Sequence, residues 1–441
     1  MSDFLNIPSL KTLKVEENEN DYYVLAEMVS PPTYCPHCGC VANLYGHGGK
    51  RQLFMHVPSD KRVGIFLDRK RFRCKECDKT FFEPLPDMDE KRMMTKKLVN
   101  YIEKLSLKRT FASLAEDIGI NEKTIRNIFR DYVNRLEKDF RIKTPKWLGI
   151  DEIHIINKPR CVITNIQDNT IIDILSDRNK PTVIDYLQRL PNRLTVRYVA
   201  MDMWQPYRDA VRLVLPQATV VVDKFHVVSM ANHALDTIRK SIREDLTPKE
   251  RRTLMHDRFI LLKRQSELDT REKLILESWT GNFKDLGLAY ELKEAFYEIW
   301  DAQSKNLALD SLKRWREQVP EHLQFAFKDL LTALKNWEAE IFAYFDHQIT
   351  NAYTESLNGL IRVMNRMGRG YSFDALRAKI LFTEGVQKVR KPNYRKQEFR
   401  DMDRMDLMHN FISEVNADYG PEVNLGADIY TIIRLLEDGK F

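Results

Sequence analysis

Two Cys-x-x-Cys pairs constrain the N-terminal part of this chain more than any other feature. "CPHC" holds Cys35 and Cys38, and "CKEC" holds Cys74 and Cys77. Each pair can form a tight knuckle that directs two thiolates at one ion, and four thiolates make a closed tetrahedral zinc site. The 35 residues between the pairs exceed the usual spacing, but they contain alternating segments that can form a hairpin. The pattern therefore predicts a zinc ribbon with one structural Zn²⁺; a redox dithiol or unligated cysteines are the alternatives.

Residues 110–133 are typical of a helix-turn-helix. The apolar residues of "TFASLAEDIGI" repeat at helical spacing until Gly119 breaks the helix, and Asn121 can cap the next one. The second helix would expose side chains that suit a DNA major groove and its phosphates. These side chains are Lys123, Arg126, Asn127 and Arg130. We predict a DNA-binding domain here; a helical hairpin inside a bundle is the alternative.

Positive charge is concentrated in two stretches. The 441-residue chain has a net charge of +6, which alone indicates little. Lys and Arg outnumber Asp and Glu by 15 to 9 from Asp89 to Lys146, and by 11 to 3 from Arg362 to Arg400. Stretches this basic favour a phosphate-binding face, with a solvated helix surface as the alternative.

From residue 147 the pattern changes to strands and helices. "WLGIDEIHII", "RCVITNI" and "TIIDILS" predict an antiparallel meander, and "LTVRYVAMD" and "ATVVVD" predict two further strands, each after an amphipathic helix. The order β-β-β-α-β-α-β is that of the ribonuclease-H fold. Acids lie within or at the end of three of these strands, at Asp151, Asp202 and Asp223.

Four motifs that follow in this order resemble one family. They are "GIDEIH", "VAMDMWQPYRDAV", "VVVDKFHVV" and "NAYTESLNGLIRVMNRMGRGYSF". Behind a zinc ribbon and a helix-turn-helix, they look like a DDE transposase of the ISL-three insertion-sequence family, over nearly the whole chain. The resemblance implies a multidomain α+β protein with a ribonuclease-H-like α/β core interrupted by a long all-helical insertion. We expect a zinc ribbon at 1–87, a helix-turn-helix at 88–145, the core at 146–228 and 349–400, the insertion at 229–348 and a C-terminal helical tail at 401–441.

The resemblance also implies that the fourth core strand lies beside the first and the fifth lies beyond it. Neighbouring strands are about 4.8 Å apart, so Asp202 can share metal ions with Asp151, whereas Asp223 starts about 10 Å from the first strand. We therefore predict Asp151, Asp202 and Glu355 as the catalytic acids, with Glu355 resting on the family match. Three carboxylates are hard ligands that suit two Mg²⁺ or Mn²⁺ ions.

The helix that carries Glu355 presents further polar groups. Asn351, Glu355 and Asn358 are spaced so that they share one face of a helix. Arg362 and Arg366 extend the same side, which suits a helix packed against a metal site that holds DNA.

Asp223 and His226 match a Cys/Asp-x-x-His signature that several DDE families carry after the second acid. The resemblance implies that they orient a metal ligand or contact the cleaved DNA strand. The alternative is structural: His226 caps the next helix and Asp223 is its partner.

The implied function is that of a DNA transposase. It would bind the terminal inverted repeats of an insertion sequence, cleave the element ends and join them to double-stranded target DNA by two-metal in-line phosphoryl transfer. Because two ends must be brought together, we expect a homodimer or a larger assembly on DNA. The alternatives are a DNA-binding regulator with an inactive ribonuclease-H-like core and a ribonuclease-H-like nuclease of another pathway. The sequence has no apolar run of membrane-spanning length and no secretory signal, so we expect a cytoplasmic protein, nucleoid-associated when bound to DNA.

Overall fold

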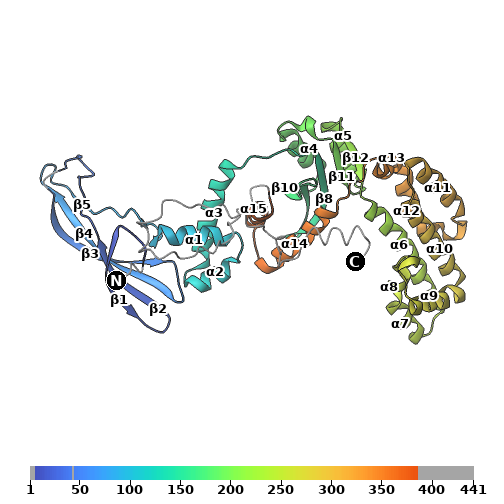
Figure 1. Cartoon of the computed structure of the whole chain (residues 1–441), viewed down its shortest axis with the longest axis horizontal. Helices are drawn as coiled ribbons and strands as arrows, with labels where there is room; N and C mark the ends of the chain where they lie inside the picture. Colours follow the sequence, from blue (N-terminus) through green and yellow to red (C-terminus); the bar gives the residue numbers. More distant parts are fainter. Residues whose placement is uncertain (1–4, 42–43, 386–441) are drawn as a thin grey trace, which may run out of the picture. The chain divides into compact units, whose positions relative to one another are not determined.

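The computed structural model describes residues 5–41 and 44–385 and divides the chain into two compact units (Figure 1). Unit 1 comprises Met1–Arg141 and Arg366–Thr383, and unit 2 comprises Ile142–Asn365 and Glu384–Phe441. The chain therefore passes from one unit to the other three times. The predicted helical tail at 401–441, and residues 386–400 of the second predicted core segment, lie outside the described residues.

Unit 1 begins with a mixed sheet in the order β1-β2-β4-β3-β7-β6, with β5 paired to β4. Buried side chains alternate with more exposed ones along β4, where Val63, Ile65 and Leu67 face the core, so one face of the sheet is packed. The antiparallel pair of β3 and β4 is the hairpin expected between the two cysteine knuckles, and that prediction is confirmed. The strands are β1 Leu10–Glu17, β2 Asp21–Met28, β3 Leu44–His56, β4 Arg62–Cys74, β5 Thr80–Phe82, β6 Met88–Asp89 and β7 Met94–Thr95.

The predicted helix-turn-helix follows as α1 Lys96–Ser106, α2 Phe111–Ile118 and α3 Glu122–Asp139. Gly119 ends α2 at a φ of 75°, in the left-handed region where glycine is favoured. The side chain of Asn121 accepts a hydrogen bond from the Lys123 N–H and caps α3, as expected. Leu114, Ile118 and Ile125 are buried and hold α2 against α3.

A fourth helix, α15 (Phe373–Glu384), packs on this motif although it lies more than 230 residues later in the chain. Lys379 of α15 is only 1% exposed. Its ammonium donates a hydrogen bond to the carbonyl oxygen of Arg109 at 2.9 Å and another to that of Ser106. The ammonium also lies over the rings of Phe111 and Phe129, at 4.6 and 5.3 Å from their centroids. Ser106 is the last residue of α1, so its carbonyl oxygen has no partner further along the helix and Lys379 closes that helix end. Arg109 lies in the connection between α1 and α2.

Because Lys379 is buried, we expect the stability of unit 1 to depend on pH. Burial lowers the pKa of Lys379 to about 7, whereas the free side chain titrates near 10.4. Between these two values the unfolded chain binds more protons than the folded chain, so the free energy of unfolding rises with pH. We expect Lys379→Met to remove this rise, which amounts to at most about 4 kcal/mol between pH 7 and 10. Thermal melts of the parent and the variant across this range measure the difference, and parallel curves would contradict it.

Unit 2 contains a five-stranded sheet in the order β10-β9-β8-β11-β12. The first three strands form the predicted antiparallel meander, and β11 runs parallel to both β8 and β12. The fourth core strand thus lies beside the first and the fifth lies beyond it, as expected. The strands are β8 Trp147–Ile155, β9 Lys158–Asn165, β10 Thr170–Ile174, β11 Tyr198–Met201 and β12 Thr219–Val222.

Different helices pack on the two faces of this sheet. Helices α4 (Lys180–Arg189) and α5 (Gln205–Val214) share one apolar core with Leu148 and Ile150 of β8. Side chains alternate along a strand, so Gly149 and Asp151 point to the other face. Helix α14 (Ala352–Gly368) contacts that face through a hydrogen bond between the hydroxyls of Thr354 and Thr164, 2.7 Å apart.

The region between the last strand and α14 is helical (Figure 1). Its buried apolar side chains form one cluster, which Val222 of β12 joins. Trp315 and Phe296 are buried at its centre, with ring centroids 5.0 Å apart. The helices are α6 Lys224–Ser241, α7 Pro248–His256, α8 Arg258–Leu262, α9 Thr270–Asn282, α10 Lys284–Ile299, α11 Lys305–Gln318, α12 Gln324–Asn336 and α13 Glu338–Phe342. Among the described residues, none of the helices is both long enough and apolar enough to cross a membrane.

Candidate active site

Three aspartates each come directly after one of three residues that are paired across neighbouring strands of the unit 2 sheet. In the ladder, Met201 of β11 pairs with Ile150 of β8 on one side and with Val222 of β12 on the other. The next residue along each strand is Asp151, Asp202 or Asp223. All three acids therefore lie at one level, with Asp202 in the middle.

Only two of these aspartates belong to a compact group of ligand atoms. Oxygens of Asp151 and Asp202 and a ring nitrogen of His226 lie within 4.8 Å of one another. His226 is in the first turn of α6, and its Nε2 is 2.5 Å from Oδ1 of Asp202 and 3.2 Å from Oε1 of Glu355. His226 thus lies between the acid that ends β11 and the acid on α14. Glu355 itself lies outside the group of three but adjoins it through this histidine.

Asp223 is occupied by backbone contacts. Its Oδ1 accepts a hydrogen bond from the Phe225 N–H at 3.0 Å, so Asp223 caps α6. Its Oδ2 accepts from the Asn351 N–H at 2.9 Å, which fixes the start of α14. Asp223 is 2% exposed, each of its oxygens accepts one of these N–H groups, and it does not belong to the compact group formed by Asp151, Asp202 and His226. The helix cap is therefore Asp223, not His226.

Asn358 of α14 and Asn351, the residue before this helix, are both buried against β8. Asn358 donates from Nδ2 to Oδ2 of Asp151 at 2.7 Å, and the Glu152 N–H donates to Oδ1 of Asp151 at 2.6 Å. Asn351 donates to the carbonyl oxygen of Ile150 at 3.3 Å. These contacts orient the Asp151 carboxylate and hold α14 in register with the strand. Arg362 is exposed further along α14, and the exposed Arg366 belongs to unit 1.

Gly149 is what allows α14 to approach β8 so closely. A Cβ added at this glycine would lie less than 3 Å from Oγ1 of Thr164, Oγ1 of Thr354 and Oδ1 of Asn351. Any side chain there would push α14, and with it Glu355, away from the sheet. Our sequence analysis did not single out Gly149. A lone glycine inside a strand pattern is, however, a known sign of close backbone approach.

The electrostatics of the site favour a cation. Burial and the neighbouring Asp202 carboxylate raise the pKa of Asp151 to about 8. Burial alone would lower the pKa of His226, but its contacts with Asp202 and Glu355 raise it to about 11. The acids thus concentrate negative charge, which a protonated His226 offsets in part and which a bound cation would stabilise further. Among the described residues, the buried Oδ1 of Asn358 has no hydrogen-bond donor. A hard divalent cation fits an oxygen-rich group of this kind.

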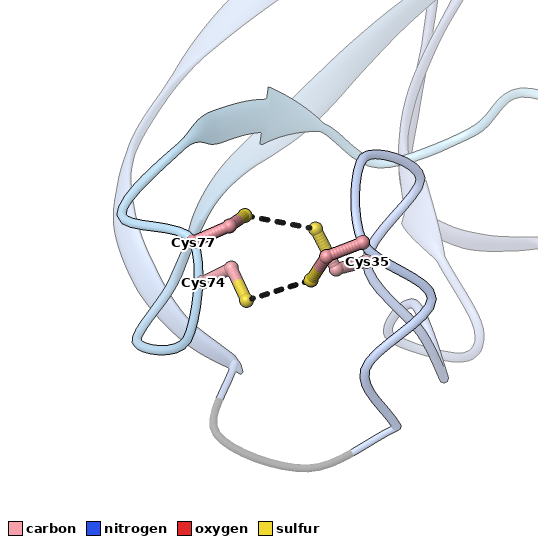
Figure 2. A group of neighbouring side chains, drawn as sticks. Cys35, Cys74 and Cys77 are labelled. Atoms are coloured by element: carbon pink, nitrogen blue, oxygen red, sulfur yellow. Dashed lines mark hydrogen bonds between the residues drawn. The ribbon is translucent and has the colours of Figure 1, made fainter.

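The four cysteines of the ribbon meet as the sequence predicts (Figure 2). Sγ of Cys35 is 3.7 Å from that of Cys77, and Sγ of Cys38 is 3.7 Å from that of Cys74. A tetrahedral zinc ion with Zn–S bonds of about 2.3 Å requires sulfur atoms about 3.8 Å apart. Burial disfavours the Cys35 thiolate, but hydrogen bonds from the backbone of His37 and Cys38 lower its pKa to about 7. The cluster therefore fits one zinc ion.

The four predicted DNA-contacting side chains lie on α3. Lys123 and Arg130 are exposed, whereas Arg126 and Asn127 are half-buried. Arg126 forms an ion pair with Glu122 at 2.5 Å, and its guanidinium lies 5.1 Å from the centroid of the Phe111 ring. Arg130 donates to Oδ1 of Asn127 at 3.0 Å. Lys123 and Arg130 are thus the most accessible of the four side chains.

Comparison with known proteins decides the family. A family model described as a transposase matches residues 148–380, which is more than half of the chain. The chain belongs to the ISL3 family of transposases. Two further models cover the N-terminal part: the zinc-finger of transposase IS204/IS1001/IS1096/IS1165 matches residues 31–77, and the helix-turn-helix domain of transposase family ISL3 matches residues 83–133. The predicted family, the zinc ribbon and the helix-turn-helix are confirmed.

Two relatives of this ISL3-family transposase carry the same description. The transposase for insertion sequence element IS1001 of Bordetella parapertussis is 22% identical over 346 residues, which cover 76% of this chain and 85% of that protein. The transposase for insertion sequence element IS1557 of Mycobacterium tuberculosis H37Rv is 24% identical over 274 residues, covering 56% of this chain and 61% of that protein.

Proposed function

We propose that this ISL3-family transposase binds the terminal inverted repeats of its element, cleaves the element ends and joins them to target DNA. The observation that carries the proposal is the meeting of Asp151 and Asp202 on neighbouring strands, with Glu355 beside them through His226. We further propose that the sheet and α14 form a ribonuclease-H-like core, and that helices α6 to α13 are an insertion between its two segments.

Each group in the site has a chemical task under this proposal. Asp151, Asp202 and Glu355 are the residues that would hold Mg²⁺ or Mn²⁺. Such cations would supply activation of water or of a DNA 3′-hydroxyl and stabilisation of the leaving oxygen. Asn358 keeps one carboxylate oxygen of Asp151 turned in a fixed direction through its amide. His226 holds Asp202 and Glu355 together on the side where α6 begins.

Under this proposal, Asp223 and Asn351 hold the helices of the site in place and take no part in the reaction. Asp223 ties the first turn of α6, which carries His226, to the first residue before α14, which carries Glu355. The two helices that supply the site are thereby linked through one buried carboxylate. The ribbon and the helix-turn-helix would read the element ends, and we propose that a dimer or larger assembly pairs two ends on DNA. Nucleoid association in the cytoplasm is part of the same proposal.

The test is an end-specific strand-transfer assay. The protein is incubated with a labelled duplex spanning one end of the element and with plasmid target DNA, in Mg²⁺, in Mn²⁺ and in EDTA. We expect nicks at the element end and joined products in either metal, and none in EDTA. End binding without cleavage would favour the inactive regulator. Cleavage of RNA–DNA hybrids without preference for the element end would favour a nuclease of another pathway.

The helix-turn-helix assignment predicts a change in salt dependence. Removing two phosphate-contacting cations lowers the slope of log affinity against log salt by about 2. We expect Arg126→Ala with Arg130→Ala to weaken end binding and to flatten the slope by this amount. Arg126 also packs on Phe111, so Arg130→Ala alone is the cleaner variant, with a change of about 1. Fluorescence anisotropy at several salt concentrations measures both, and an unchanged slope would locate the DNA surface elsewhere.

A further inference from the structure

Residues 366–383 belong by their contacts to the DNA-binding unit, not to the unit that carries the acids. The transposase model continues through residue 380, and the helix-turn-helix model ends at residue 133. The sequence match thus assigns α15 to the catalytic part. In the structure, Lys379 inserts into the helix-turn-helix, and Tyr371 packs edge-on against Phe111 with ring centroids 5.2 Å apart.

Further contacts fasten α15 to α3. Arg377 forms an ion pair with Glu137 of α3 at 3.0 Å. The rings of Phe382 and Phe140 pack edge-to-face at 6.0 Å. A Cβ at Gly368 would fall within 3 Å of the Tyr371 ring, so this glycine admits Tyr371 to the interface. Polar and aromatic contacts spread over the helix in this way fix both its distance from α3 and its direction.

The docked α15 leaves a groove along the face of α3 on which DNA recognition is predicted. The groove has a volume of about 580 Å³. Arg126, Asn127 and Arg130 line it from α3, and Ala375 and Arg377 line it from α15. Other lining residues include Asn134 and Glu137 of α3, and Ser372 and Asp374 at the start of α15. The predicted DNA-reading face is therefore one wall of a two-walled groove.

We infer that α15 is the second wall of the DNA-binding groove, so that duplex DNA is held between α3 and α15 with its sugar–phosphate backbone in the groove. This inference rests on the proposed function, because it names where the element end is held. The groove has the size of a small-molecule pocket, so it takes a stretch of one backbone rather than the whole duplex. Arg130, for which the described residues supply no ion pair, suits a phosphate oxygen, whereas Arg126 and Arg377 already pair with Glu122 and Glu137. The amide and hydroxyl groups of the groove are the other common phosphate and sugar partners.

Of the two acidic side chains in the groove, one is paired with an arginine and the other, among the described residues, is not. This difference makes the inference testable. The Glu137 carboxylate is neutralised by Arg377. Asp374 is exposed, and within the part of the chain that the structure describes no ion pair to it is found. A backbone phosphate in the groove would meet this unneutralised carboxylate. Asp374 therefore opposes DNA binding if, and only if, DNA approaches α15.

The first experiment is a gain of affinity. In the full-length protein, Asp374→Asn should tighten binding to a labelled duplex spanning one element end by about two- to fivefold, the effect of one nearby surface charge. Glu116→Gln makes the same charge change on the exposed face of α2, away from the groove, and should alter the affinity less than twofold. A gain of affinity cannot result from misfolding. Equal effects of the two variants would overturn the inference.

The second experiment blocks the groove. Ala375→Trp in the full-length protein places a large side chain between the two walls and should weaken end binding about tenfold or more. Ala112→Trp, on the exposed surface of α2 outside the groove, should leave it within about twofold. Equal zinc content and melting temperature establish that Ala375→Trp is folded. Parent-like binding by that folded variant would overturn the inference.

The two proposals fail in different ways. If Arg130→Ala weakens end binding while Asp374→Asn and Ala375→Trp do not change it, then α3 reads DNA without α15 and only this inference is wrong. If Arg130→Ala also has no effect, the helix-turn-helix does not bind the element end, and that part of the proposed function fails.

Discussion

Asp202→Asn should abolish both cleavage of the element end and strand joining, while end binding and the melting temperature stay close to those of the parent. A neutral amide cannot replace a charged oxygen ligand of Mg²⁺. Losing several kcal/mol of charge stabilisation in the transition state corresponds to about a thousandfold or more in rate. Asp202 is part-exposed and makes its short contact with His226, so we expect the substitution to change the free energy of unfolding little. The strand-transfer assay and a thermal melt measure the two effects.

Asp223→Asn is the matched control, because the same chemical change is made one strand further along the sheet. An amide can accept only one of the two backbone N–H bonds from Phe225 and Asn351. The other N–H would face the NH₂ group, at a cost of about 1–3 kcal/mol in unfolding free energy. We therefore expect a lower melting temperature, with activity reduced only about 10–100-fold. A stable, inactive Asp223→Asn beside an active Asp202→Asn would reverse our assignment of the acids.

Metal in a crystal gives a second measurement of the same assignment. Mn²⁺ soaked into the protein should lie about 2.2 Å from oxygens of Asp151 and Asp202. The Asp223 carboxylate should keep its two backbone partners. An ion on Asp223, with Asp202 turned away, would contradict both the structure-based argument and the kinetic prediction.

The core strands were predictable from sequence periodicity, and their order in the sheet from the resemblance to the family. Strands ending at Asp202 and Asp223 were expected, and β11 lies between β8 and β12 as anticipated. The environment of Asp223 was not predictable. When Asp-x-x-His follows a buried strand, the Asp and His can equally well be a reactive pair or the cap of the next helix. The Asn351 N–H that engages its second oxygen comes from a residue 128 positions later.

The docking of α15 shows where local patterns stop being informative. Lys379 counts toward the basic stretch from Arg362 to Arg400, which our sequence analysis associated with a phosphate-binding face. In the structure this lysine is buried among aromatic rings and backbone carbonyls of unit 1. Nothing in the adjoining residues distinguishes it from exposed Arg369. Its environment comes from residues 106–129, and such long-range packing cannot be read from helical periodicity alone.

Cys74→Ser should remove zinc from the ribbon and unfold the two knuckles. Cys74 is fully buried at the end of β4, and its sulfur lies 3.7 Å from that of Cys38. Apart from the sulfur ligands, the local core has little to hold it together, since Phe81 is its only other buried member among the described residues. Zinc binding supplies most of the folding free energy in small sites of this kind, about 10–16 kcal/mol in zinc-finger peptides. Loss of one thiolate should therefore both release the zinc ion and unfold the two knuckles.

Zinc content per chain and limited proteolysis between residues 31 and 80 measure these two losses. We expect about one zinc per chain in the parent and close to none in Cys74→Ser, with rapid cleavage in both knuckles. Cys40→Ser is the control: Cys40 packs beside the cluster but lies outside the four ligands, so zinc and protease resistance should be retained. Because β4 also pairs with β2 and β3 in the main sheet of unit 1, we expect unfolding to stop at the knuckles and to leave the Val63–Leu67 core intact. Full zinc occupancy in Cys74→Ser would mean that another side chain, not Cys74, completes the tetrahedron.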